Sequence, residues 1–133
     1  MARWVRFMAA EGAGFGRLDG DSIEVCDGDL FTAPRPTDRR LPLAEVRLTR
    51  PVTPSKVIAV WNNFRLLLTK MNLRVPAEPL YFIKAPNTYL DPGATIRKPA
   101  CDSRIVFEGE LAVVIGKEAR AVTERNALEH MFG

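Results

Sequence analysis

The sequence predicts an α+β fold that consists mainly of β-sheet, and three observations support this prediction. First, several short segments alternate in polarity or are wholly apolar, as strands do. Second, turn signals rich in glycine, proline and aspartate separate these segments, as at residues 19–21. Third, apolar residues follow helical spacing over only two stretches, residues 62–72 and 123–133. We therefore expect sheets with two short helices attached.

Composition narrows the classes of protein to which the chain can belong. Its 133 residues are 47% hydrophobic and 26% charged, which is ordinary for a globular protein. The net charge of +3 comes from scattered lysines and arginines, so we expect no nucleic-acid partner. No run approaches the roughly 20 apolar residues of a membrane span, so we expect no membrane partner. Cys26 and Cys101 form no CxxC pattern, which disfavours zinc and disulfides and favours a cytoplasmic location.

Residues 1–50 are expected to form a small β-rich N-terminal domain. The first residues alternate in polarity, and Asp19-Gly20-Asp21 is a hairpin signal that precedes a strand over residues 22–26. A GxGxG string over residues 12–16 resembles a phosphate-binding loop, but no helix follows it. We therefore interpret this string as part of a turn and a strand.

Residues 51–133 are expected to form the N-terminal part of a second domain. Residues 34–42, which hold three prolines among charged side chains, are interpreted as a loop that precedes it. The expected elements of the second domain are, in order, a buried strand over 56–60, a helix from Asn62 or Asn63 to Asn72, a strand over 80–83, a turn at 91–93 and a helix capped by Thr123.

The most informative segment is residues 106–116, which read VFEGELAVVIG and predict a buried strand. In a strand, Glu108 and Glu110 project to the same face because they are two residues apart. Two like charges at the edge of a core are unfavourable unless a positive group neutralises them. A hard divalent cation bound by carboxylate oxygens would do so. The alternative is that both side chains reach solvent or pair with nearby arginine and lysine.

Three blocks of sequence, in matching order and spacing, carry a family resemblance. Residues 54–60 read PSKVIAV and precede Asn63-Phe64, residues 78–86 read EPLYFIKAP, and residues 107–117 read FEGELAVVIGK. These blocks resemble the lead-in strand with its Asn-Tyr turn, the EEPLLFLKPP block and the YEGELAVVIGK signature of the fumarylacetoacetate hydrolase family. The resemblance implies a mixed β-roll fold, and the chain ends before the family's aspartate ligand in an Asn-Asp-Val block. We interpret the sequence as a fragment truncated at its C-terminus.

The resemblance implies a metal-dependent enzyme that acts on small 2-oxo acids or 2-hydroxydienoates. Known activities in the family are hydrolysis of acylpyruvates, decarboxylation of oxo acids and isomerisation of dienoates from aromatic catabolism. Glu108 and Glu110 would be two ligands of Mg²⁺, or of Mn²⁺ or Ca²⁺. The family usually forms homodimers, so a homodimer is expected here too.

The sequence departs from the family where the lid of the active site is expected. Many members carry a catalytic histidine and glutamate in an NYxxHxxE pattern, and Leu67 and Lys70 stand at these positions here. Lys70 could act as a base or an oxyanion partner, or could be a solvated helix residue. Lys84 could orient the substrate or the lid. His130, the only histidine, is expected to be a surface or capping residue.

Two functions therefore remain open at this point. The first is an enzyme whose cation stabilises an enolate, in which isomerisation or decarboxylation is favoured over hydrolysis because a leucine cannot transfer protons. The second is a non-catalytic member of the family that binds a metal or ligand without turnover.

Overall fold

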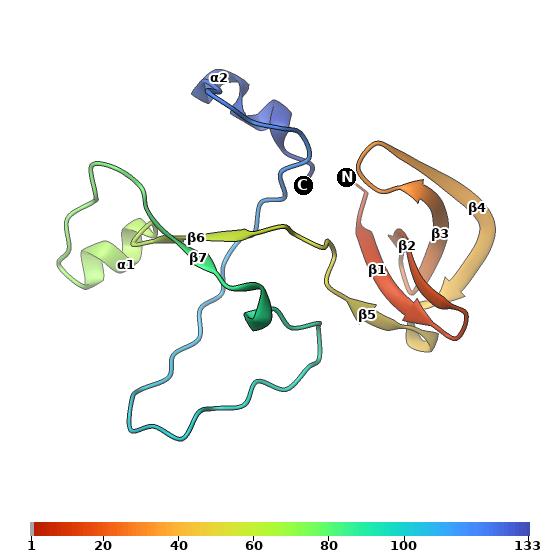
Figure 1. Ribbon diagram of the computed structural model, residues 1–133, viewed down its shortest axis with the longest axis horizontal. Coiled ribbons are helices and arrows are strands. Elements are labelled where there is room, and N and C mark those ends of the chain that lie inside the picture. Colours follow the sequence, from red (N-terminus) through yellow and green to blue (C-terminus); the bar gives the residue numbers. More distant parts are fainter. Residues whose placement is uncertain (1) are drawn as a thin grey trace.

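A computed structural model describes residues 2–133 and confirms that the chain is mainly β-sheet with few helices (Figure 1). The first sheet has five antiparallel strands in the order β4-β3-β2-β1-β5. A 3₁₀ turn, η1 (Leu43–Glu45), connects β4 to β5. The strands are β1 (Trp4–Ala9), β2 (Gly12–Asp19), β3 (Ser22–Asp29), β4 (Ala33–Pro42) and β5 (Arg47–Thr49).

The core of the protein lies on one face of this five-stranded sheet. Phe7 and Ile23 are 3% and 0% exposed, and Val25 is also buried. These residues sit at alternate positions of β1 and β3, as expected where one sheet face is covered. The partly buried side chains that pack on them are Val5, Ala9, Leu18, Leu41, Leu43, Val46 and Leu48.

The glycine string over residues 12–16 belongs to β2, which confirms its interpretation as strand and turn. A Cβ atom on Gly14 would lie 2.8 Å from the Phe7 ring. A Cβ atom on Gly16 would lie 2.2 Å from the Glu24 carbonyl oxygen. Glycine is therefore required here for close packing of β2 against β1 and β3. The hairpin predicted at residues 19–21 is also confirmed, because Asp19 pairs with Ser22.

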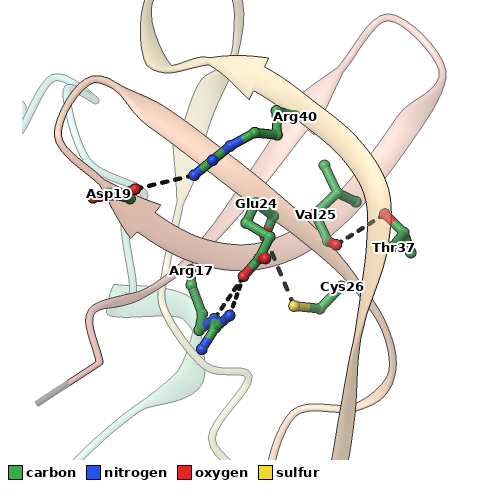
Figure 2. Close-up of polar contacts among 7 residues, drawn as sticks. All are labelled: Arg17, Asp19, Glu24, Val25, Cys26, Thr37 and Arg40. Atoms are coloured by element: carbon green, nitrogen blue, oxygen red, sulfur yellow. Dashed lines mark hydrogen bonds and ion pairs between the residues drawn. The ribbon is translucent and has the colours of Figure 1, made fainter.

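The interpretation of residues 34–42 as a loop is wrong, because they form most of β4. β4 is the outer strand of the sheet, where the missing N–H of a proline costs no hydrogen bond if it faces away. A bulge between Glu24 and Cys26 in β3 shifts the register of this pairing. There the Thr37 hydroxyl donates a hydrogen bond of 2.9 Å to the Val25 carbonyl oxygen (Figure 2).

Two ion pairs link strands of this sheet, one between the neighbours β2 and β3 and one between β4 and β2 across β3. The Arg17 guanidinium donates hydrogen bonds to the Glu24 carboxylate, its partner residue on β3 (Figure 2). Arg40 on β4 lies 3.0 Å from an Asp19 carboxylate oxygen. All four side chains are at least partly solvated, so these pairs contribute specificity of pairing more than stability.

The second part of the chain contains short elements around a two-stranded antiparallel sheet (Figure 1). None of the helices in residues 2–133 has the length and apolar character that a membrane span requires. The elements are β6 (Val57–Trp61), α1 (Arg65–Lys70), β7 (Leu80–Lys84), η2 (Pro86–Thr88), α2 (Glu124–Ala127) and η3 (Leu128–His130).

Three expectations for these elements need correction. The strand predicted over 56–60 forms as β6 but is mostly exposed, because only β7 pairs with it. The helix predicted from Asn62 or Asn63 begins instead at Arg65, since Asn62 has a φ of 54° and turns the chain first. Thr123 precedes α2 as predicted, but its side chain makes no capping hydrogen bond.

The prediction of a buried strand over residues 106–116 is wrong for this structure. The segment is irregular apart from a single bridge between Ile115 and Met131. Phe107 is 99% exposed and Leu111 is 90% exposed. The physical reason is that, within residues 2–133, no strand lies beside residues 106–113 to satisfy their backbone groups or to cover their side chains.

An aromatic contact joins the C-terminal segment to the first sheet. The rings of Phe31 and Phe132 pack edge to face with centroids 4.8 Å apart. Asp29 shapes the turn that presents Phe31, because its carboxylate accepts hydrogen bonds from the hydroxyl and N–H of Thr32 and from the Phe31 N–H. These bonds lower the pKa of Asp29, with the Thr32 hydroxyl contributing most.

A carboxylate makes a second connection between the two parts of the chain. Asp91 lies in the turn predicted at residues 91–93, which is confirmed by a hydrogen bond from the Ala94 N–H to the Asp91 carbonyl oxygen. Its carboxylate accepts hydrogen bonds from the backbone and side chain of Arg50 and from the side chain of Arg47 on β5. The backbone N–H of Arg50, followed by Arg47, lowers the pKa of Asp91.

We predict that truncating two phenylalanines will have very different effects on stability. Phe7→Ala should cost about 3–5 kcal/mol of unfolding free energy because it opens a cavity in the core. In the 133-residue chain, Phe107→Ala should change it by less than about 0.5 kcal/mol because the ring is exposed to solvent. Chemical denaturation of both variants measures the difference. Equal losses would show that residues 106–113 are buried in solution.

We predict that Asp91→Asn will weaken the connection between β5 and the turn in a pH-dependent way. Because the folded pKa of Asp91 lies below its ordinary value of 3.8, the carboxylate stabilises the fold above that value. This contribution is lost as the pH falls through the folded pKa. Thermal unfolding should therefore show a lower Tm for the variant at neutral pH and a shrinking difference in acid.

The matched control for this experiment is Asp38→Asn. Asp38 is exposed and makes no ion pair within residues 2–133. A Tm difference for Asp91→Asn that does not depend on pH, or one that the control reproduces, would contradict the role assigned to Asp91.

Candidate functional site

A cavity of about 370 Å³ is lined by Glu108 and Glu110 together with α1, where the sequence predicts the lid. One part of its lining comes from Glu108, Gly109 and Glu110. The other part comes from the start and the body of α1, forty residues earlier in the chain. The residues that α1 and its N-cap contribute are Phe64, Leu66, Leu67 and Lys70. The cavity therefore lies between α1 and residues 108–110.

Local backbone structure explains how each of these side chains reaches the cavity. α1 is a single short helix in which Leu68 is buried and anchors the opposite face. Leu67 and Lys70 are three residues apart, so they share a face of the helix. Gly109 separates the two glutamates, and a Cβ atom there would meet no atom within 4 Å. The glutamates reach the same cavity although their segment is not in a sheet.

The charges in this cavity are distributed unevenly between its two sides. Glu108 and Glu110 line one side of the cavity, and Lys70 belongs to the helix that lines the other. None of the ion pairs found in residues 2–133 involves these three groups. All three are exposed to solvent. Lys70 is therefore available to bind a negative group rather than being neutralised by the glutamates.

The donor chemistry of the pair fits a hard divalent cation. Two carboxylates separated by one residue and facing one cavity offer oxygen ligands, which Mg²⁺, Mn²⁺ and Ca²⁺ prefer. Within the described residues, no cluster of three or more histidine, cysteine, aspartate or glutamate side chains could hold a metal. Glu108 and Glu110 thus fit as two ligands of a cation that would need further oxygen ligands from water, substrate or additional polypeptide.

Two other residues singled out in the sequence lie outside this cavity. Lys84 ends β7, and its ammonium lies 4.7 Å from the centroid of the Phe82 ring. His130 ends η3, and its carbonyl oxygen accepts hydrogen bonds from the N–H groups of Gly116 and Lys117. Its Nδ1 atom is buried without a partner in the structure. The structure therefore brings Lys70, Glu108 and Glu110 together but not Lys84.

A second cavity, of about 490 Å³, was not anticipated from the sequence. Arg47, Arg50 and Asp91 line it together with Tyr89, whose ring lies 5.9 Å from the Arg50 guanidinium carbon. Both arginines are committed to Asp91. Apart from the turn at Asp91, no sequence signal could have located this cluster, because it joins segments about forty residues apart.

Two family models match the chain. The model described as "Fumarylacetoacetate (FAA) hydrolase C-terminal" matches residues 56–133, which include α1 and the two glutamates. The model described as "Rv2993c-like, N-terminal" matches residues 2–51, which hold the five-stranded sheet. Together they account for nearly the whole chain.

Curated and structural relatives agree with these models. Protein Rv2993c of Mycobacterium tuberculosis is 35% identical over 96% of this chain and 51% of its own length. The oxaloacetate tautomerase YisK of Bacillus subtilis is 32% identical over 87% of this chain and 45% of its own length. The crystal structure of 2-hydroxyhepta-2,4-diene-1,7-dioate isomerase from Mycobacterium marinum is 33% identical to this chain and matches it with a TM-score of 0.84. The match covers 100% of this chain and 52% of the isomerase chain.

The chain thus spans about half the length of the relatives that it matches. Within that half, this chain and the crystal structure share the same overall fold. α1 and residues 108–110 both lie within the half that is shared with this longer relative.

Proposed function

This chain belongs to the fumarylacetoacetate hydrolase family, and we propose that it carries part of the active site of a cation-dependent enzyme that isomerises or tautomerises 2-oxo acids. The observation that supports this proposal is the cavity in which Glu108 and Glu110 lie beside α1. Relatives include proteins named as an oxaloacetate tautomerase and as a dienedioate isomerase.

Glu108 and Glu110 would hold the cation at one side of the cavity. When bound, a divalent cation supplies Lewis-acid polarisation of the substrate carbonyl group. The two carboxylates fix the position of that positive charge, and they leave room in the cavity for a small organic acid. Without a cation, the same carboxylates would repel an anionic substrate, so we expect activity to depend on the ion.

α1 would close the other side of the cavity with a mainly apolar surface. Phe64, Leu66 and Leu67 offer carbon atoms and no proton-transfer group. Hydrolysis requires a base that activates water, and Leu67 stands where many family members carry the histidine of that base. Isomerisation and tautomerisation need no base that activates water, so the loss of this histidine weighs less against them, although each still needs a group that moves a proton between oxygen and carbon.

A second function is favoured by the same substitution at Leu67. If no residue near the cavity transfers protons, the protein would bind a cation and an organic acid without turning it over. Lys70 does not remove this alternative, because a charged lysine is a hydrogen-bond donor and cannot accept a proton. Turnover and binding must therefore be measured separately.

We predict that Glu108→Gln and Glu110→Gln will each weaken Mn²⁺ binding and cation-dependent turnover by at least about tenfold, because each removes a charged oxygen ligand. The protein should be expressed from its complete reading frame. Isothermal titration measures Mn²⁺ binding, and ultraviolet absorbance follows the conversion of enol to keto oxaloacetate with and without Mg²⁺.

Glu118→Gln is the matched control, because Glu118 is exposed and lies outside the cavity. It should leave both measurements unchanged. Binding of Mn²⁺ at Glu108 and Glu110 without turnover of any 2-oxo acid would support the non-catalytic alternative. Mn²⁺ binding with wild-type affinity in both the Glu108→Gln and the Glu110→Gln variants would contradict both functions.

A further inference from the structure

We propose that Lys70 determines substrate specificity by binding a second carboxylate, remote from the 2-oxo acid group of the substrate. This inference rests on the proposed function, since it assumes that the 2-oxo acid group occupies the side of the cavity near Glu108 and Glu110. It adds to that function the residue that binds the far end of the substrate, Lys70, and the chemical group that Lys70 binds, a carboxylate.

The two sides of the cavity differ in chemistry, so they favour different groups at the two ends of a substrate. Residues 108–110 offer two carboxylates, and α1 offers one ammonium group, that of Lys70. Every other side chain in the lining is apolar, and Gly109 has none. A ligand that fills the cavity therefore has one position at which a distant negative group is stabilised.

The environment of Lys70 leaves its charge available for this role. It makes no ion pair within residues 2–133, although two glutamates line the same cavity. It lies in the last turn of α1, where a positive charge interacts favourably with the helix dipole. Its three N–H donors can each hydrogen-bond to a carboxylate oxygen.

The apolar residues around Lys70 favour ligands whose only distal polar group is a carboxylate. Phe64, Leu66 and Leu67 cannot hydrogen-bond to a hydroxyl or amide group at the far end of a ligand. They can pack against the carbon chain that joins its two ends. A ligand without the distal carboxylate would leave the ammonium hydrated, so the expected preference is the gain from a charged hydrogen bond over hydration.

The test compares two 2-oxo acids of four carbons, oxaloacetate and 2-oxobutanoate, of which only the first has a distal carboxylate. Their dissociation constants are measured by isothermal titration in Mg²⁺, with the protein expressed from its complete reading frame. The wild type should bind oxaloacetate at least about tenfold more tightly, as expected for a charged hydrogen bond. Lys70→Gln should bring this preference close to one, and Lys70→Glu should reverse it.

The control is Lys98→Gln, which removes an exposed lysine outside the cavity and should keep the wild-type preference. A preference that persists in Lys70→Gln, or affinities for both acids that fall equally, would overturn the role of Lys70 while leaving the proposed function intact. A wild type that binds both acids equally would also overturn it. If the wild type binds neither acid in the presence of Mg²⁺, the inference and the proposed function are both overturned.

Discussion

The structure depends on one constraint, which is that a sheet must pair its backbone groups and cover at least one apolar face. The five-stranded sheet satisfies this constraint within itself, since β1 and β3 bury Phe7, Ile23 and Val25. The segment that carries Glu108 and Glu110 does not, because residues 106–113 have no neighbouring strand within the described chain. The first sheet therefore pairs its strands and covers its core face within the described residues. Glu108 and Glu110 instead lie in a segment that has no neighbouring strand there.

This difference determines how the candidate site is positioned. The second part of the chain is attached to the first by the carboxylate of Asp91 and by the contact of Phe31 with Phe132. Neither contact touches residues 108–110, and the cavity that these residues line is otherwise lined by α1 and its N-cap. Relatives are about twice as long as this chain and share its backbone. We expect additional polypeptide of this kind to supply neighbouring strands, cover exposed side chains such as Phe107 and fix the two carboxylates.

Patterns that depend on adjacent residues were predicted well from the sequence. The hairpin at residues 19–21 and the turn at residues 91–93 formed as expected because their chemistry is local. The prolines of residues 34–42 predict a loop but lie in β4, because the sequence does not show that this strand is at the edge of a sheet. Residues 106–116 have the apolar pattern of a buried strand, but burial also requires partners. The cavity joins α1 to residues forty positions later, so only the family resemblance, not spacing, linked them, and the cluster around Asp91 had no comparable signal.

We propose above all that Glu108 and Glu110 together hold a divalent cation beside α1. The most direct measurement is anomalous diffraction from crystals of the protein, expressed from its complete reading frame and grown with Mn²⁺. We predict one strong anomalous peak within bonding distance of a carboxylate oxygen of each glutamate, in the cavity that Leu67 and Lys70 line. A peak bonded to other residues, or crystals with ordered Glu108 and Glu110 side chains and no ion between them, would contradict it.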